Sequence, residues 1–176
     1  MKGTVVSGHP GSNEHAPFYD RYTRLVPESD LAAGLETQLP EVLALFRSIP
    51  ESRAGHRYAP DKWSVAQVLR HIVDSERVFG FRAFWFARAA GTEMPGFEQD
   101  DFMRTSPAGE ELGRLAREFE QLRRSHILFF ESLDAEAWLR SGVASGNPVS
   151  VRALAAIMVG HVRHHEAILR ERYLAG

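Results

Sequence analysis

The chain has 176 residues, of which 44% are hydrophobic and 25% are charged, and both values are typical of one globular domain. Its 21 basic and 23 acidic side chains give a formal net charge of -2, so no basic excess points to a nucleic-acid partner. Cysteine is absent, which excludes disulfides, thiolate metal sites and a cysteine nucleophile and leaves nitrogen and oxygen as the metal-binding atoms.

The N-terminal stretch, residues 1–26, mixes Gly, Pro, Ser, Asn and His in no periodic order. We interpret it as an extended arm, followed by one domain over residues 27–176. The first 20 residues have no apolar segment of the kind that a secretory signal carries. No stretch reaches the roughly 18 apolar residues of a membrane span. The sequence therefore predicts a cytoplasmic protein without a membrane partner.

The first predicted helix follows the arm. Ser29 or Asp30 can cap its N-terminus, because a short side-chain oxygen accepts a hydrogen bond from a free N–H group of the first turn. The helical pattern runs to about Ser48, and Pro50 marks its end. Pro40 lies inside the pattern, where it removes a backbone donor, so we expect it to kink or divide the helix.

A second long helix is predicted from Ser64 to about Ala90. Ser64 and Gln67 have the spacing of a capping box, in which each side chain bonds the backbone N–H of the other residue. The flanking residues 50–62 and 91–106 are rich in turn-forming residues. We expect both of these segments to be loops.

The later part of the chain continues the helical pattern. Ser106 followed by Pro107 is a cap with proline at the first helical position. The expected order is a third long helix over 106–133, a short helix over 134–140, turns over 141–148 and a last helix over 150–174. No alternating strand pattern of convincing length is present. The sequence thus predicts an all-α protein, an up-and-down four-helix bundle with one short extra helix.

Two histidines of the last predicted helix, His161 and His165, stand one turn apart. At about 100° per residue both fall within about 20° of the centre of the apolar face, whereas His164 falls about 80° away, near its edge. Two buried imidazoles need polar partners, and a divalent cation satisfies both because each neutral ring offers a lone pair. The alternative is a pair of core histidines bonded to other groups of the protein. The residues alone leave both interpretations open.

A third ligand would have to come from another helix. His71 lies in the middle of the second predicted helix, with Asp74 and Ser75 at i+3 and i+4 on the same side. This polar stripe either lines a cavity or is the solvated face of an amphipathic helix. The histidines without a comparable setting are expected at the surface or in loops: His9, His15, His56 and His126.

Four stretches of the chain carry a resemblance to a known family. They are YAPDKWSVAQVLRHIVDSER at 58–77, FEQDDF at 97–102, GVASGNPVS at 142–150, and 160–173, which begins GHVRHH. In their order and spacing they resemble the DinB-like superfamily, in its YfiT-like branch of metal-dependent hydrolases. Together they span almost the whole chain beyond the N-terminal arm.

The resemblance implies a four-helix bundle with one metal ion at an end of the core. One ligand comes from the second helix and two from an HxxxH pair on the last, which by position are His71, His161 and His165. Zinc or nickel is the implied metal, and a homodimer is the implied assembly. Relatives often carry a carboxylate after the Gly-His pair, where this chain has Val162 and Arg163.

This departure weakens the case for a general base on the last helix. Asp74 is the nearest candidate catalytic carboxylate by helical position, although ion pairing within the bundle is its alternative role. Asp100 and Asp101, in the predicted loop before the third helix, are further candidates that could reach the site.

Three histidine ligands leave a metal its full charge and an open position, the pattern of a catalytic site. We therefore expect an enzyme acting on a small molecule, either by thiol S-transfer with a low-molecular-weight thiol as co-substrate or by hydrolysis. A non-catalytic metal-binding module, for stress response or ligand binding, is the alternative. A third possibility is a bare bundle that dimerises through the aromatic residues of the second helix: Phe79, Phe81, Phe84, Trp85 and Phe86.

Overall fold

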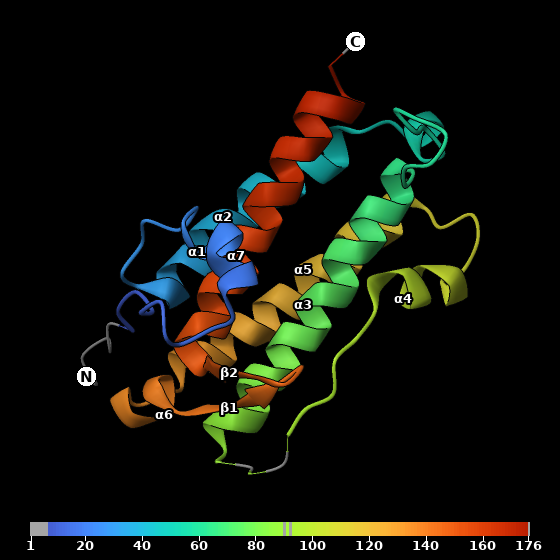
Figure 1. Cartoon of the computed structure of the whole chain (residues 1–176). Coiled ribbons are helices and arrows are strands. Elements are labelled where there is room, and N and C mark those ends of the chain that lie inside the picture. Colours follow the sequence, from blue (N-terminus) through green and yellow to red (C-terminus); the bar gives the residue numbers. More distant parts are fainter. Residues whose placement is uncertain (1–6, 90, 92, 176) are drawn as a thin grey trace.

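The computed structural model describes residues 7–89, 91 and 93–175. Four long helices form a bundle (Figure 1): α2 (Leu31–Ser48), α3 (Val65–Ala87), α5 (Leu112–Glu131) and α7 (Val151–Ile168). The shorter helical elements are η1 (Pro17–Tyr19), α1 (Asp20–Thr23), η2 (Glu51–Arg53), α4 (Gln99–Thr105), α6 (Ala135–Leu139) and the π-helical η3 (Leu169–Tyr173). Strands β1 (Ser141–Ala144) and β2 (Asn147–Ser150) form an antiparallel hairpin.

The predicted caps fix where several helices begin. Asp30 accepts a hydrogen bond from the backbone of the first turn of α2, and Asp134 does the same for α6. Ser64 and Gln67 form the complete capping box of α3. Ser150 caps α7. These starting points are confirmed because they depend on local chemistry within a few residues.

The expected four-helix bundle is present, but its helices do not simply alternate in direction. The main contacts join α3 to α7 and α5, and α2 to α5 and α7, so the consecutive helices α2 and α3 lie on a diagonal. α3 and α5 run in the same direction (Figure 1). The up-and-down expectation therefore needs correction, because the connection over residues 88–111 is long enough to return beside α3, and it carries α4 there.

The start of the third long helix also differs from the prediction. Ser106 does not cap it, because the Ser106 hydroxyl donates to the carbonyl of Phe102, 2.9 Å away, and so closes α4. α5 begins only at Leu112, whose backbone N–H donates to the carboxylate of Glu51 at 2.8 Å. The cap therefore comes from η2, which is distant in the sequence and cannot be found by a local pattern.

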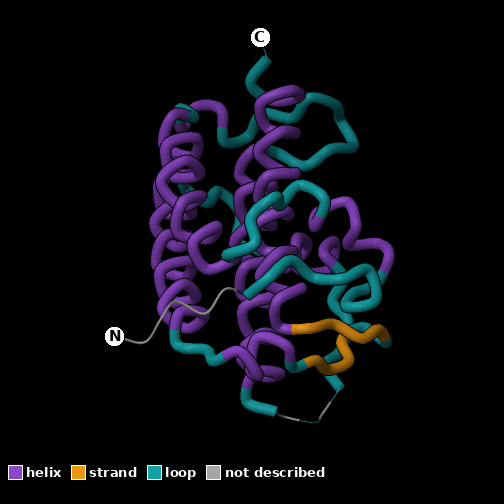
Figure 2. Tube along the Cα trace, turned by 90° about the vertical axis from the view of Figure 1, so that its left-hand side faces the viewer, coloured by secondary structure: helices purple, strands orange, loops and turns teal. Residues whose placement is uncertain are grey.

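Two further expectations are wrong for physical reasons. α2 runs unbroken through Pro40, which lies at an exposed position where water can satisfy the freed carbonyl. The stretch over 141–148 is part of a hairpin whose strands are too short for an alternating pattern, with positive φ at Ser145 and Gly146 in its turn. The hairpin closes the end of the bundle opposite the C-terminus (Figure 2). α3 ends at Ala87, and its expected end, Ala90, lies outside the described residues.

The described part of the N-terminal segment is not uniformly extended. It contains η1 and α1, and α1 packs on α7. Tyr22 and Val26 are buried in this contact. The segment is anchored by Glu14, whose carboxylate accepts hydrogen bonds from Arg152 and from the hydroxyl of Ser150. Hydrophobic side chains at irregular spacing give no periodic signal, so the sequence showed only an arm.

The hydrophobic core runs between the long helices, and its aromatic residues on α3 divide into two groups. Phe79 and Phe86 are buried, whereas Phe81 and Phe84 are exposed. Within the described residues, no helix is both long and apolar enough to cross a lipid bilayer.

Candidate metal centre

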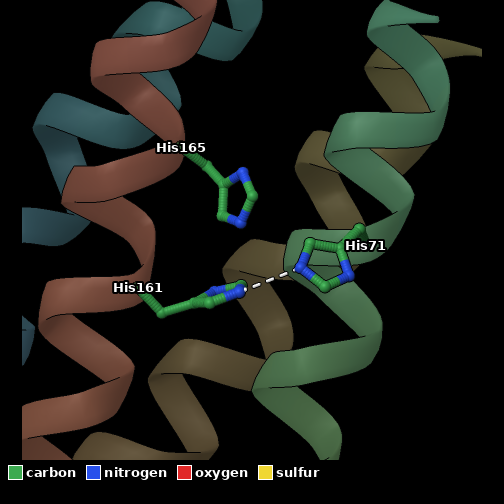
Figure 3. Close-up of side chains that lie close together, drawn as sticks. All are labelled: His71, His161 and His165. Atoms are coloured by element: carbon green, nitrogen blue, oxygen red, sulfur yellow. Dashed lines mark hydrogen bonds between the residues drawn. The ribbon is translucent and has the colours of Figure 1, made fainter. Parts of the chain in front are cut away.

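Three histidines from two helices converge inside the bundle. His71 on α3 and His161 and His165 on α7 point into the gap between these helices (Figure 3). One ring nitrogen of each lies within 4.8 Å of the others, and Nε2 of His71 is 3.0 Å from Nε2 of His161. Among the described residues, this is the one grouping of three or more His, Asp or Glu side chains at metal-binding distances. The structure thus brings together the three predicted ligands.

The packing of α3 and α7 explains this convergence. α7 is buried at nearly every position from Val151 to Val162, and His161, near the end of this run, is 3% exposed. His165 lies one turn further along the same face and is partly buried. His71 is buried on the opposite helix. The inward orientation predicted from the helical rotation is therefore confirmed.

The three imidazoles are neutral at pH 7. Burial lowers the pKa of His71 to about 4 and that of His165 to about 3. Burial, assisted by the neighbouring imidazoles, also holds the pKa of His161 well below its ordinary value. A metal ion requires the neutral form of histidine, so these side chains offer their lone pairs without losing a proton.

The donor set fits a divalent metal ion. Metal–nitrogen bonds of about 2.0–2.1 Å in a tetrahedral site place ligand nitrogens roughly 3.3 Å apart. The 3.0 Å between the nearest nitrogens of His71 and His161 is close to this separation. Three neutral nitrogen donors suit zinc, nickel, cobalt or iron rather than calcium or magnesium, which prefer oxygen.

A pocket of about 330 Å³ opens beside the histidines. His71 and His161 form part of its wall. The other lining side chains are mainly aromatic or small and polar: Phe18, Tyr19, Tyr22, Ser75, Phe79, Phe97, Glu98, Gln99 and Ser145. The size is at the lower end of the range for small-molecule sites, so a metal ion bound here would face a compact ligand site.

Tyr22 is the main pocket residue that the sequence did not reveal. Its ring meets the rings of His161 and His164 edge-on, with centroids 5.2 and 5.4 Å apart. A Cβ on Gly160 would lie 2.0 Å from the carbonyl oxygen of Tyr22, so only glycine lets α1 approach α7 this closely. The glycine before His161 was the available signal, but it does not identify its partner.

Asp74 lies in an ion-pair cluster. Its carboxylate is 3.4 Å from the guanidinium of Arg70, which also pairs with Glu110 and Glu118. Burial raises the pKa of Asp74, and Arg70 opposes this shift. The two further candidates, Asp100 and Asp101, lie at exposed positions of α4 and not in the expected loop, and the charge of Asp100 opposes the effect of burial, which lowers the pKa of His71. Asp100 therefore lies close enough to act electrostatically on the centre.

The remaining histidines divide into those at the surface and those with structural contacts. His164 is half-buried at the edge of the cluster, as predicted. His15 is buried, and His126 donates a hydrogen bond to the buried carboxylate of Glu76 at 3.0 Å. The expectation of a surface or loop position is therefore wrong for His126, which lies in α5, whereas His15 lies in a loop as expected but is buried there. The partner of His126 comes from the packing of α5 on α3, which spacing along one helix does not indicate.

Comparisons with known proteins agree with this architecture. A comparison with curated protein sequences gave no match. Among solved structures, the chain is similar to YfiT from Bacillus subtilis, described as a probable metal-dependent hydrolase with an unusual four-helix bundle topology. The two chains are 15% identical, with a TM-score of 0.70 over 83% of this chain and 87% of YfiT. The family model of the DinB superfamily matches residues 35–169, most of the chain, and the protein belongs to this superfamily.

Proposed function

We propose that this protein is a metal-dependent enzyme that hydrolyses a small molecule. It holds one divalent ion, zinc or nickel, through His71, His161 and His165. The observation that carries the proposal is the convergence of three neutral imidazoles beside a compact aromatic pocket, two of which, His71 and His161, form part of its wall. The description of YfiT, which has the same fold, as a metal-dependent hydrolase supports the same chemistry.

The ligand set determines what the ion contributes. A divalent ion bound by three neutral ligands retains its charge, lowers the pKa of a bound water or thiol, and polarises a carbonyl oxygen. The protein supplies the surroundings of that ion. Tyr22 and Phe79 are buried beside His161 and exclude bulk water from this side of the centre. Excluding water strengthens every electrostatic interaction within the pocket.

Thiol S-transfer is the second candidate. One observation favours it: Asp74, the carboxylate nearest to His71 by helical position, is engaged by Arg70 and is not a free base. A low-molecular-weight thiol is a nucleophile that needs no general base once a nearby cation has lowered its pKa. In this case the pocket would hold an electrophile beside the co-substrate thiol.

Two paired assays separate these reactions. Zinc- or nickel-reconstituted protein is tested with an activated ester and with an aryl halide, each with and without a cysteine-derived thiol, beside the His161→Ala/His165→Ala variant. Ester turnover without thiol, absent in the variant, supports hydrolysis. Release of halide ion from the aryl halide only when thiol is present supports S-transfer. Metal binding without turnover in either assay would contradict an enzymatic role and favour a non-catalytic metal-binding module.

The homodimer implied by the family resemblance is part of the proposal. Phe81 and Phe84 on α3 and Leu128 on α5 are large hydrophobic side chains that are exposed in the single chain. Aromatic residues are favoured in interfaces between subunits. Light scattering coupled to size-exclusion chromatography tests this assignment, and a monomer mass at micromolar concentration would contradict it.

A further inference from the structure

One polar group in the pocket wall has no partner in the protein. Ser75 is 1% exposed, and among the described residues its hydroxyl oxygen makes no hydrogen bond. The residue lines the pocket together with His71 and His161. Buried hydroxyls are nearly always satisfied, so an unsatisfied one at a pocket wall indicates a ligand or a water molecule that completes it.

The position of Ser75 relates it to the metal centre. It follows His71 by four residues and precedes Phe79 by four, so the three side chains form one stripe along α3. At a rise of 1.5 Å per residue, Ser75 lies about 6 Å from His71 along the helix axis, and Phe79 about 12 Å. A molecule that reaches the histidines from the Phe79 side must therefore pass the hydroxyl.

The buried part of the pocket wall has no Lys, Arg, Asp or Glu side chain among its described residues. Its most buried lining residues are Tyr22, His71, Ser75, Phe79 and His161. The one carboxylate of the lining, Glu98, is exposed. Burying an ion without an opposite charge is unfavourable, so in metal-free protein the part of a ligand that enters here is uncharged.

The nearest cation on the same stripe is occupied elsewhere. The guanidinium of Arg82 donates hydrogen bonds to the carbonyl of Pro95 and to the hydroxyl of Ser145. It also lies over the ring of Phe97, 5.5 Å from the centroid. Arg82 does not itself line the pocket. It therefore supports the wall and does not provide an anion site.

Aromatic rings set the shape of the space. Phe79 meets Tyr19 edge-on at a centroid distance of 6.1 Å and Phe97 at 6.3 Å. Phe18 meets Tyr22 in the same way at 6.1 Å. Ring edges and faces arranged at right angles are complementary to another ring. A volume of about 330 Å³ limits the ligand to a compact molecule.

We propose that this pocket takes a compact, uncharged, ring-bearing molecule whose hydrogen-bonding atom meets the hydroxyl of Ser75. That contact lies about one helical turn from the histidines and selects the orientation of the ligand. The inference rests on the proposed function only in naming the histidine end of the pocket as the reacting end. It assigns to Ser75 a role in binding and positioning, not in the chemical step.

Binding of four probes of similar shape tests this. Benzamide is uncharged, benzoate is an anion, benzamidinium is a cation, and isopropylbenzene has no hydrogen-bonding atom. Binding is measured by calorimetry and ligand-detected NMR on wild-type protein, Ser75→Ala and Ser132→Ala. The last is a matched control, because Ser132 is exposed and bonds only the carbonyl of Phe129. The charge series is run on metal-free protein, in which benzoate has no ion to bind.

We expect wild-type protein to bind benzamide at least tenfold more tightly than either charged probe. Ser75→Ala should weaken the binding of benzamide about five- to tenfold, which is the effect of one neutral hydrogen bond, and should leave the binding of isopropylbenzene unchanged. Ser132→Ala should alter neither. Equal benzamide affinity in wild type and Ser75→Ala, preference for a charged probe, or no binding of any probe would overturn the inference.

Zinc and nickel content, measured on the same samples after incubation with each metal, separates this inference from the proposed function. Benzamide binding that depends on Ser75 in a protein that takes up neither metal leaves the pocket assignment standing and refutes the metal-dependent enzyme. If the histidines bind zinc but the benzamide affinity is the same in wild type and Ser75→Ala, only the pocket assignment is refuted.

Discussion

α3 carries two buried polar clusters on different faces, and they differ in how they are completed. On the face toward α5, the carboxylate of Glu76 accepts two hydrogen bonds from the Arg123 guanidinium, at 2.7 and 2.9 Å, and one from His126. Arg123 also donates to Gln38, whose amide donates to the carbonyl of Val159. This closed network joins α2, α3, α5 and α7.

The face toward α7 carries His71 instead. It meets His161 and His165, with no carboxylate among the three, and its Nε2 is hydrogen-bonded to Nε2 of His161 at 3.0 Å. The contrast shows that burial alone does not identify a functional site. In the closed network, charge is balanced inside the protein. The histidine cluster contains no charged side chain, which is why we propose that a metal ion completes it.

The largest expected effect comes from breaking the closed network. Arg123→Met leaves the Glu76 carboxylate buried without its main partner, so we expect the free energy of unfolding to fall by about 3–5 kcal/mol. Denaturant titration measures this. The neighbouring Arg124, exposed and paired with Glu120, is the matched control, and Arg124→Ala should cost less than about 1 kcal/mol. Equal losses in the two variants would contradict the contrast between the clusters.

In metal-free protein, the two clusters should affect the free energy of unfolding over different pH ranges. In metal-free protein, His71 has a pKa of about 4 and His165 of about 3, while unfolded histidines take up protons near pH 6.5. The contribution of these two histidines to the free energy of unfolding is thus fully present above pH 6.5 and is lost as the pH decreases toward 3. We expect a loss on the order of 3 kcal/mol between pH 7 and pH 5.

The closed network responds in a different range. Burial alone would raise the pKa of Glu76, but Arg123 and His126 lower it to about 2. Its contribution is present above about pH 4.5 and is lost only as the pH falls toward 2. Denaturant titrations in a chelator at pH 7 and pH 5 test the assignment. If the free energy of unfolding of a His71→Gln/His165→Gln variant falls as much between pH 7 and pH 5 as that of the wild type, these histidines are not the cause of the pH dependence.

A smaller effect is expected where α1 crosses α7. Gly160→Ala places a Cβ against the carbonyl of Tyr22, so the free energy of unfolding should fall by about 1–3 kcal/mol and amide exchange over residues 17–25 should quicken. Gly113→Ala, in α5, is the matched control, since its Cβ would meet only the flexible Arg117 at 3.7 Å. Unchanged exchange over 17–25 in Gly160→Ala would mean that glycine is not what holds α1 in place.

The smallest effect is expected at Asp74. As a partly buried member of the Arg70 cluster, it should tolerate Asp74→Asn with a loss of about 1 kcal/mol or less and with unchanged metal content. We expect turnover to fall by less than about tenfold, whereas loss of a general base costs roughly a hundredfold or more. A loss of that larger size, at normal stability, would return Asp74 to the role of catalytic carboxylate.

Local chemistry explains what could be predicted from the sequence. Caps such as Ser64 and Ser150 and the inward rotation of His161 and His165 depend only on residues within a few positions. The pairing with His71 came from the family resemblance, because no spacing rule links two separate helices. The Glu51 cap of α5, the return of the chain beside α3 and the contact of α1 with Gly160 all join distant segments, so no local pattern revealed them.

Metal content tests the central claim most directly. Protein purified without a histidine tag or a nickel column is analysed by mass spectrometry, before and after incubation with zinc or nickel, beside His161→Ala/His165→Ala and the control His56→Ala. We predict about one equivalent in the wild type and in the control, and none in a double variant that keeps its helical circular dichroism. No metal in the wild type after incubation, or the same content in the double variant, would contradict the account.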